Sequence, residues 1–433
     1  MKRKLIALLL CAALLAGTLS TGAYAAGAGE AVESPCAYGK WLEDGLNKLA
    51  EGLRQWIGLL LQRLGIVTNS HYENVSPELC DPEATQEARR LMAFLAEQYG
   101  KTTLSGNYVS PYNDYSRAVF RGGEDGGGGL DARLSNELFV VNRVTGKYPA
   151  IIGLDYTNVE LPQHGWRDWV TQLAEQYHGL GGIVTLCWHW RIPKNPASLA
   201  KDFAYMNAND AAFYTDDITG FDLKATLADP DSRYYAWLMQ SVDRLAAELT
   251  VLRDAGVPVL WRPLHEASGG WFWWGTDREG YIALYRLLYD KLVNEHGLHN
   301  LIWVWNGQNP AWYPGDDVVD MLGDDPYHED FLDPGFSRRF RSTHRAAPAR
   351  MVGMSENNKV PDVCAMRLFN TRWQYFVLWD REMILKRAPD AASSPGGDGF
   401  AREYLDDYVS EKDLRDTYNH GQVLTLDEMP GWD

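Results

Sequence analysis

Eight short apolar segments, separated by stretches of helical periodicity, limit the folds open to this chain from residue 102 onward. The segments are rich in aliphatic and aromatic residues, as buried strands are. They comprise residues 102–107, 149–155, 183–190, 257–265, 300–305, 318–323, 351–356 and 375–379. Strands that alternate with helices pair in parallel through right-handed crossovers, and eight such units close into a barrel. The sequence therefore predicts an α/β fold, a (β/α)8 TIM barrel.

The N-terminus has the pattern of a secretory signal peptide over residues 1–25. The basic run Lys2–Lys4 precedes an apolar stretch, Leu5–Leu15, that is too short to span a bilayer, and Ala23–Ala25 forms a small-x-small cleavage site. Cys11 follows Leu10, which is too large for the small residue required before a lipid-modified cysteine. We therefore expect an extracellular, secreted protein without a lipid anchor or membrane span.

The remaining chain divides into an N-terminal helical extension, residues 26–80, and a barrel domain, residues 81–433. Apolar residues recur at helical spacing over 40–66, which predicts an amphipathic helix or helical hairpin docked on the barrel. Because exported proteins can form disulfides, Cys36 and Cys80 are the pair we predict to be bonded. Cys187 lies in an apolar strand and is expected to be a buried free thiol.

Polar and aromatic side chains gather where the predicted strands end, which is where barrel proteins place their catalytic groups. Glu266 and Glu356 end the fourth and seventh strands, which face each other across the barrel mouth. Two facing carboxyl groups suit glycoside hydrolysis, in which one is protonated and the other ionised. The other candidates at or near strand ends are Asp155, His189, His265, Trp305, Asn306 and Tyr327.

The fourth strand carries the strongest local signal, because Arg262, His265 and Glu266 arrive together just before the aromatic run Trp271–Trp274. Burying such groups is costly unless they pair, so Arg262 is expected to make a fixed charge pair beneath the site. Aromatic rings can stack on sugars, and the chain has 17 Trp and 23 Tyr. The alternative interpretation is a structural Arg–Glu pair beside an aromatic core.

The net charge of the chain bears on which partners it can bind. The net charge of −17 disfavours nucleic acid, whose phosphates need Lys and Arg. The charge says nothing specific about a neutral substrate such as a polysaccharide. We expect a monomeric protein.

Seven short motifs of this chain recur together in one known family. They are Trp261–Glu266, Gly269–Gly275, Gly153–Tyr156, Trp188–Trp190, Asp325–Tyr327, Met354–Glu356 and Leu424–Pro430. Together they resemble glycoside hydrolase family 26, which belongs to a clan of retaining (β/α)8 enzymes. The resemblance runs from about residue 82 to Pro430, and Asn357–Pro361 departs from a Glu-x-Gly pattern expected in some members.

The resemblance implies a double displacement, with Glu356 as nucleophile and Glu266 as general acid and then base. It implies that His265 and Tyr327 hydrogen-bond near the nucleophile and that His189 and Trp271 line sugar subsites. Asp155, Trp305 and Asn306 are further substrate-contact candidates. The implied substrate is β-1,4-mannan or glucomannan, the alternatives within the family are mixed-linkage β-1,3-1,4-glucan and β-1,3-xylan, and no cofactor is implied.

Two other classes remain as alternatives. A metal-dependent barrel hydrolase could use His189, His265, Asp155 and Glu266, but such enzymes usually carry His-x-His on an early strand, where this chain has Ser105–Asn107. An inactive glycan-binding protein should have lost one carboxylate, and both are present.

Overall fold

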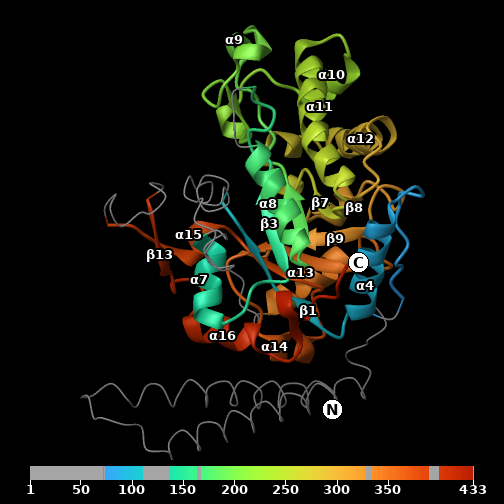
Figure 1. Ribbon diagram of the computed structural model, residues 1–433. Coiled ribbons are helices and arrows are strands. Elements are labelled where there is room, and N and C mark those ends of the chain that lie inside the picture. The colour runs from blue at the N-terminus through green and yellow to red at the C-terminus, as the bar shows by residue number, and fades with distance from the viewer. Residues whose placement is uncertain are drawn as a thin grey trace, which may run out of the picture.

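The computed structural model describes residues 72, 74–110, 136–162, 167–327, 334–389 and 399–432. Its centre is a closed barrel of parallel strands in the order β10-β11-β2-β3-β4-β7-β8-β9 (Figure 1). The strands are β2 (Gly106–Tyr108), β3 (Ile151–Asp155), β4 (Ile183–Cys187), β7 (Val259–Arg262), β8 (Leu301–Trp305), β9 (Met321–Asp324), β10 (Val352–Asn357) and β11 (Phe376–Leu378). Each predicted segment supplies one barrel strand, so the predicted TIM barrel is confirmed.

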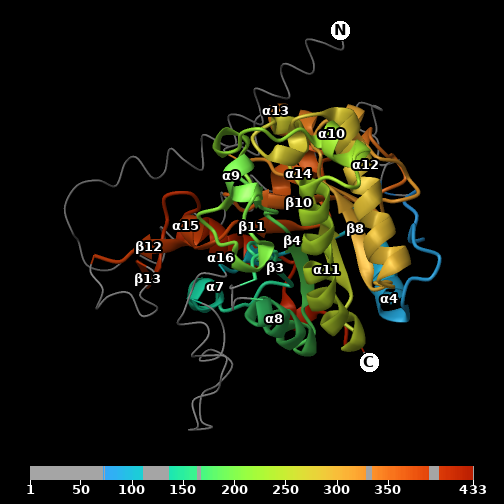
Figure 2. The ribbon, with the colours of Figure 1, turned by 90° about the horizontal axis from the view of Figure 1, so that it is seen from above.

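Amphipathic helices surround the barrel (Figures 1 and 2). In α11 the buried residues Leu238, Leu245, Leu249 and Leu252 recur at spacings of seven, four and three, which places them on one face. The helices are α4 (Gln86–Gln98), α7 (Asn136–Thr145), α8 (Arg167–Gly179), α9 (Pro196–Leu199), α10 (Leu223–Ala228), α11 (Arg233–Asp254), α12 (Arg278–Tyr289), α13 (Pro334–His344), α14 (Val363–Phe369), α15 (Arg381–Ile384) and α16 (Glu411–Tyr418).

In the described residues, three short two-stranded sheets lie outside the barrel. Before the first barrel strand, β1 (Thr103–Leu104) pairs with β14 (Val423–Leu424), so the C-terminal segment closes the N-terminal end of the barrel. Between β4 and α11 the chain makes a long excursion that contains β5 (Ile192–Pro193) and β6 (Ala211–Ala212). The third sheet pairs β12 (Leu385–Arg387) with β13 (Phe400–Tyr404) in antiparallel fashion.

The segment before residue 81 also packs on the barrel. The Ser76 N–H donates to the Ala349 carbonyl at 3.0 Å, and the Cys80 N–H donates to the Asp320 carboxylate at 2.6 Å. The packed body therefore begins N-terminal of the expected domain boundary. The predicted signal peptide, the predicted amphipathic stretch 40–66 and Cys36 lie outside the described residues. Cys80 is a free thiol among the described residues, and its predicted bond to Cys36 stays a prediction.

No helix in the described part of the chain is both long enough and apolar enough to cross a membrane.

Candidate active site

The chain turns sharply after β7 and thereby presents Glu266. Leu264 and Glu266 have φ angles of 52° and 54°, left-handed values that non-glycine residues rarely adopt. The turn is held by the Glu266 N–H, which donates to the Asn306 carbonyl at 2.7 Å. Backbone strain of this kind is kept where the surroundings enforce it, often at functional sites. Glu266 lines a cleft of about 420 Å³ at the C-terminal end of the barrel strands.

Three carboxyl groups meet in this cleft. One oxygen each from Glu266, Asp325 and Glu356 lies within 4.8 Å of the others. Beneath them, the fully buried Arg262 donates to Glu356 and, at 3.2 Å, to Asp325. Tyr327 donates its hydroxyl to the second oxygen of Glu356 at 3.0 Å. Arg262 makes the fixed charge pair expected from the sequence, and the same pair belongs to the cleft.

The two facing acids have different surroundings. Both donors described above point at Glu356, which stabilises that side chain as an anion. Glu266 instead accepts from the Trp271 indole N–H at 2.9 Å and shares a hydrogen bond with the neighbouring acid Asp325. Burial, together with repulsion from the Glu356 carboxylate, raises the pKa of Glu266 to about 7. Burial likewise raises the pKa of Asp325 well above its ordinary value. The cluster can thus hold a proton near neutral pH opposite an anion.

Asp155 orients His189 from the neighbouring strand β3. Its two oxygens accept from the His189 backbone N–H at 3.1 Å and contact ring Nδ1 at 2.7 Å. The other ring nitrogen, Nε2, lies 3.3 Å from Nε2 of His265. Burial lowers the pKa of His189, but the Asp155 carboxylate outweighs it and the net pKa is raised. For His265, burial and then the Arg262 charge hold the pKa well below its usual range, so His265 is neutral.

Aromatic side chains form the walls of the cleft. Trp271 and Tyr214 are 43% and 49% exposed, which is high for such large rings and leaves their faces open to a sugar. Tyr214 comes from the excursion after β4 and stacks on Phe272 with ring centroids 5.5 Å apart. A second hollow of about 150 Å³ adjoins the cleft, and His189, Tyr214 and Trp379 line both. The cleft therefore continues past the carboxylates, as binding of a chain of sugars requires.

The family is settled by a sequence match. The model of glycosyl hydrolase family 26 matches residues 80–391. The chain belongs to glycoside hydrolase family 26.

Known relatives cover most of this family-26 chain. A mannan endo-1,4-β-mannosidase of Thermothelomyces thermophilus is 32% identical over 90% of this chain and 71% of its own length. Mannan endo-1,4-β-mannosidase A of Piromyces sp. is 31% identical over 83% of this chain, which spans 51% of that protein.

Solved structures similar to this chain also include family-26 mannanases. The family-26 β-(1,4)-mannanase of Podospora anserina is 30% identical, with a TM-score of 0.62 over 83% of this chain and 70% of that one. A ruminal family-26 endo-β-1,4-mannanase is 28% identical, with a TM-score of 0.67 over 84% of this chain and 72% of that one.

In this family-26 chain, most predicted site residues come together. Glu266, Glu356, His189, His265, Trp271 and Tyr327 line the main cleft, and Asp155 lines the adjoining hollow. His265, however, contacts His189, and the hydrogen bonds that reach Glu356 come from Arg262 and Tyr327.

Two of the predicted substrate contacts are wrong in position. Trp305 is fully buried and packs against Tyr313, because it shares the outward face of β8 with Trp303, two residues before it. Asn306 is also fully buried and donates to Asp325 at 2.7 Å, so it supports the acid cluster from behind.

Sequence reasoning missed several lining residues, namely Asp325, Tyr214, Phe272, Gln308, Arg339 and Trp379. Asp325 had a usable signal, since it follows β9 directly and stands in a motif already noted. Tyr214 had no such signal, because it lies in the excursion between β4 and α11, far along the chain from the end of any barrel strand.

A metal would compete with contacts that are already made. Asp155, Cys187 and His189 place one potential ligand atom each within 4.8 Å of one another, as do the three acids. Both oxygens of Asp155 already contact His189, and Arg262 already supplies positive charge to two of the acids. The chemistry proposed below uses side chains alone.

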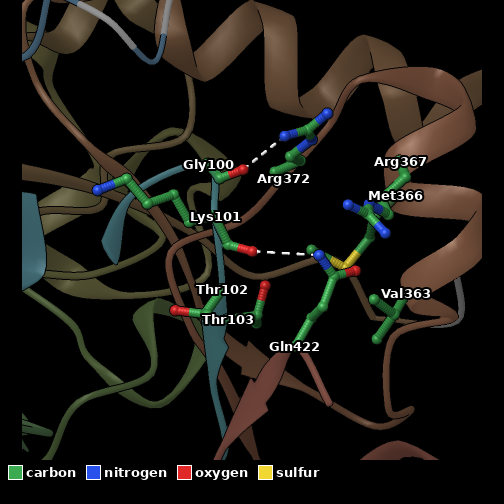
Figure 3. A pocket seen from close by; sticks show the side chains of 9 residues that line it. All are labelled: Gly100, Lys101, Thr102, Thr103, Val363, Met366, Arg367, Arg372 and Gln422. Atoms are coloured by element: carbon green, nitrogen blue, oxygen red, sulfur yellow. Dashed lines mark hydrogen bonds between the residues drawn. The ribbon is translucent and has the colours of Figure 1, made fainter. Parts of the chain in front are cut away.

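A small cavity at the opposite end of the barrel is not part of this site (Figure 3). It measures about 10 Å³, enough for about one water, and lies between the turn after α4 and α14. Arg372 spans it with a hydrogen bond of 2.5 Å to the Gly100 carbonyl.

Proposed function

We propose that this family-26 glycoside hydrolase is a secreted endo-β-1,4-mannanase that cleaves mannan and glucomannan with retention of configuration. The spacing of the acids is the observation that carries the mechanism. Carboxyl groups of retaining glycosidases lie about 5–5.5 Å apart, whereas inverting enzymes leave about 6.5–9.5 Å for a water. A separation within 4.8 Å between oxygens of Glu266 and Glu356 supports direct attack by a carboxylate.

The surroundings of the two acids support one division of roles. Glu356 receives hydrogen bonds from Arg262 and Tyr327, so it is the anion that attacks the anomeric carbon. Glu266, whose pKa burial raises to about 7, gives its proton to the leaving oxygen. Once the leaving sugar has gone, ionised Glu266 takes a proton from water, and that water breaks the bond between the sugar and Glu356. Both carboxyl groups end in their starting states.

Mannan as the substrate is supported by the names of the relatives, which are mannan endo-1,4-β-mannosidases. The open cleft with its adjoining hollow supports attack within a chain. Secretion is supported by the signal-peptide pattern in residues 1–25.

Substrate and stereochemistry can be tested together. The purified protein would be assayed on mannan, glucomannan, lichenan and β-1,3-xylan, and proton NMR would record the first reducing ends formed. We expect release of mannooligosaccharides with β reducing ends. Cleavage of lichenan or β-1,3-xylan without mannan would keep the mechanism and overturn the specificity. An initial α product would mean inversion and would remove Glu356 as the nucleophile.

A further inference from the structure

A second buried acid lies behind the cleft on the same side as Asp155. Glu160 follows β3 in the turn at residues 157–160, and its side chain is fully buried. One carboxylate oxygen accepts from the Trp188 indole N–H at 3.1 Å, and the other accepts from the Arg191 backbone N–H at 2.8 Å. These two donors stand on either side of His189. Burying a carboxylate is costly, and here N–H donors together with the nearby charge of Arg191 favour the ionised form of Glu160.

Between the two donors, the His189 N–H donates to Asp155 at 3.1 Å, and the rest of the segment is held through its rings and carbonyls. The Trp188 ring stacks on Trp190 with centroids 4.1 Å apart and planes 14° apart. The Trp190 carbonyl accepts from Trp273 at 2.6 Å, and the Arg191 carbonyl accepts from Trp237 at 2.9 Å. These contacts fix the outer part of the loop to neighbouring elements. Glu160 supplies the bonds that tie residues 188 and 191 back to the end of β3.

We propose that Glu160 is a positioning residue, whose carboxylate clamps the 188–191 loop and so sets the orientation of His189 in the cleft. From this loop position His189 contacts both Asp155 and His265. A carboxylate is suited to the task because both of its oxygens accept, whereas an amide accepts through one atom and donates through the other. Burial raises the pKa of Glu160 to about 7, and the Trp188 and Arg191 bonds lower it, as expected where they favour the anion.

The kinetic test uses Glu160→Gln, which keeps size and shape but directs an amide N–H₂ at one of the donors. We expect kcat/KM on mannopentaose to fall on the order of 10- to 100-fold, as for a displaced group beside reacting atoms. If Glu160 acts through His189, adding Glu160→Gln to His189→Ala should cause no further loss. Multiplicative losses in the double variant, or an activity of Glu160→Gln within about twofold of wild type, would overturn the proposal.

A second readout needs no substrate, and this matters because the kinetic test rests on the proposed function. The ring titration of His189 can be followed by NMR, with the signal assigned by its loss in His189→Ala. In wild type the Asp155 carboxylate raises the pKa of His189. In Glu160→Gln we expect that pKa to fall toward the ordinary value of about 6.5, because the ring loses its alignment with Asp155. An unchanged His189 titration would reject the positioning role even if mannan is not the substrate.

Two further variants serve as a control and as a substitute for Glu160→Gln. Glu428 also accepts hydrogen bonds in a loop, from the Thr425 N–H at 2.7 Å, the Thr425 hydroxyl at 2.6 Å and Lys147 at 3.3 Å, but it lies at the opposite end of the barrel. Glu428→Gln should leave kcat/KM and the His189 titration unchanged. If Glu160→Gln does not fold, Trp188→Phe removes one donor from the other side of the clamp and should lower the pKa of His189 by a smaller amount. No change in Trp188→Phe would then count against the proposal.

Discussion

The indole N–H of Trp271 donates a hydrogen bond of 2.9 Å to the carboxyl group of Glu266. Trp271 is 43% exposed, so one side chain offers both a flat face toward the cleft and a polar contact to the proposed acid. A hydrogen bond to a carboxylate favours its ionised form and lowers its pKa. Burial and the Glu356 carboxylate act in the opposite direction and together hold the pKa of Glu266 at about 7.

Trp271→Phe should therefore shift to higher pH the point at which kcat/KM falls on the alkaline side of the pH profile. Because Glu266 must be protonated to act as the acid, kcat/KM of wild type should fall as pH rises through about 7. Phe keeps a ring but removes the donor, so the pKa of Glu266 and the limb should both move upward. The pH profile of kcat/KM on mannopentaose measures this. Trp432→Phe, which removes an indole bond to the Gly181 carbonyl, is the matched control and should leave the limb in place. A downward shift in Trp271→Phe would contradict the argument.

The raised pKa of Glu266 also predicts how stability depends on pH. Between the ordinary value of 4.5 and about 7, the folded protein retains a proton that the unfolded chain releases. The contribution of Glu266 to stability therefore falls as pH rises through this window. Glu266→Gln removes that effect, so its free energy of unfolding relative to wild type should increase between pH 4.5 and pH 8, on the order of 1–3 kcal/mol. Urea denaturation at both pH values would show it, and a constant difference would refute it.

The barrel was predictable because eight apolar segments and their helical spacers recur along the chain with few ambiguities. The same pattern located Glu266 and Glu356, since strand ends place side chains at the barrel mouth. What it could not fix is which of two adjacent residues faces the cleft. Trp305 and Asn306 follow one another, and Trp305 packs outward against Tyr313 while Asn306 bonds Asp325 behind the site. The direction depends on where β8 ends to within one residue.

Long-range contacts were the second limit. Tyr214 reaches the cleft because the excursion after β4 folds back and pairs with the Phe272 backbone. Glu160 reaches the His189 loop because β3 and β4 are neighbours in register from Ile151 with Ile183 to Asp155 with Cys187. Neither contact leaves a spacing signal in the chain, since both arise from tertiary packing between distant segments.

Tyr327→Phe should weaken catalysis without loss of fold. The Tyr327 hydroxyl donates to Glu356 at 3.0 Å, and a bond to a charged group contributes about 1.5–3 kcal/mol. If that bond steadies the nucleophile, kcat should fall roughly 10- to 100-fold, measured on mannopentaose. Tyr313 makes a comparable bond of 2.8 Å to Asp316 in an exposed loop, so Tyr313→Phe is the control. Equal small losses in both variants would argue against a special role for Tyr327.

Arg262→Met should destabilise the protein strongly. The guanidinium is fully buried between Glu356 and Asp325, and its removal leaves two acids facing each other without a cation. Breaking a buried pair in this way costs about 3–5 kcal/mol. The exposed pair of Arg286 with Asp317 offers a contrast, and Arg286→Met should cost no more than about 1 kcal/mol. Urea denaturation near pH 7 compares them. A loss in Arg262→Met no larger than in Arg286→Met would contradict this account.

Variants of the two proposed catalytic acids should lose activity to different extents when the leaving group of the substrate is varied. Glu266→Ala removes only the proton donor, so its loss should be large on mannan and small for the first step on an aryl β-mannoside with a good leaving group. The covalent intermediate should then accumulate, because water has lost its base, and azide should restore turnover to a β-mannosyl azide. Glu356→Ala should be inactive on both substrates, since no leaving group replaces a missing nucleophile, and azide should give the α anomer. Steady-state rates with NMR of the azide products test both variants. Equal losses on both substrates in both variants would mean that the acid and the nucleophile have been assigned wrongly.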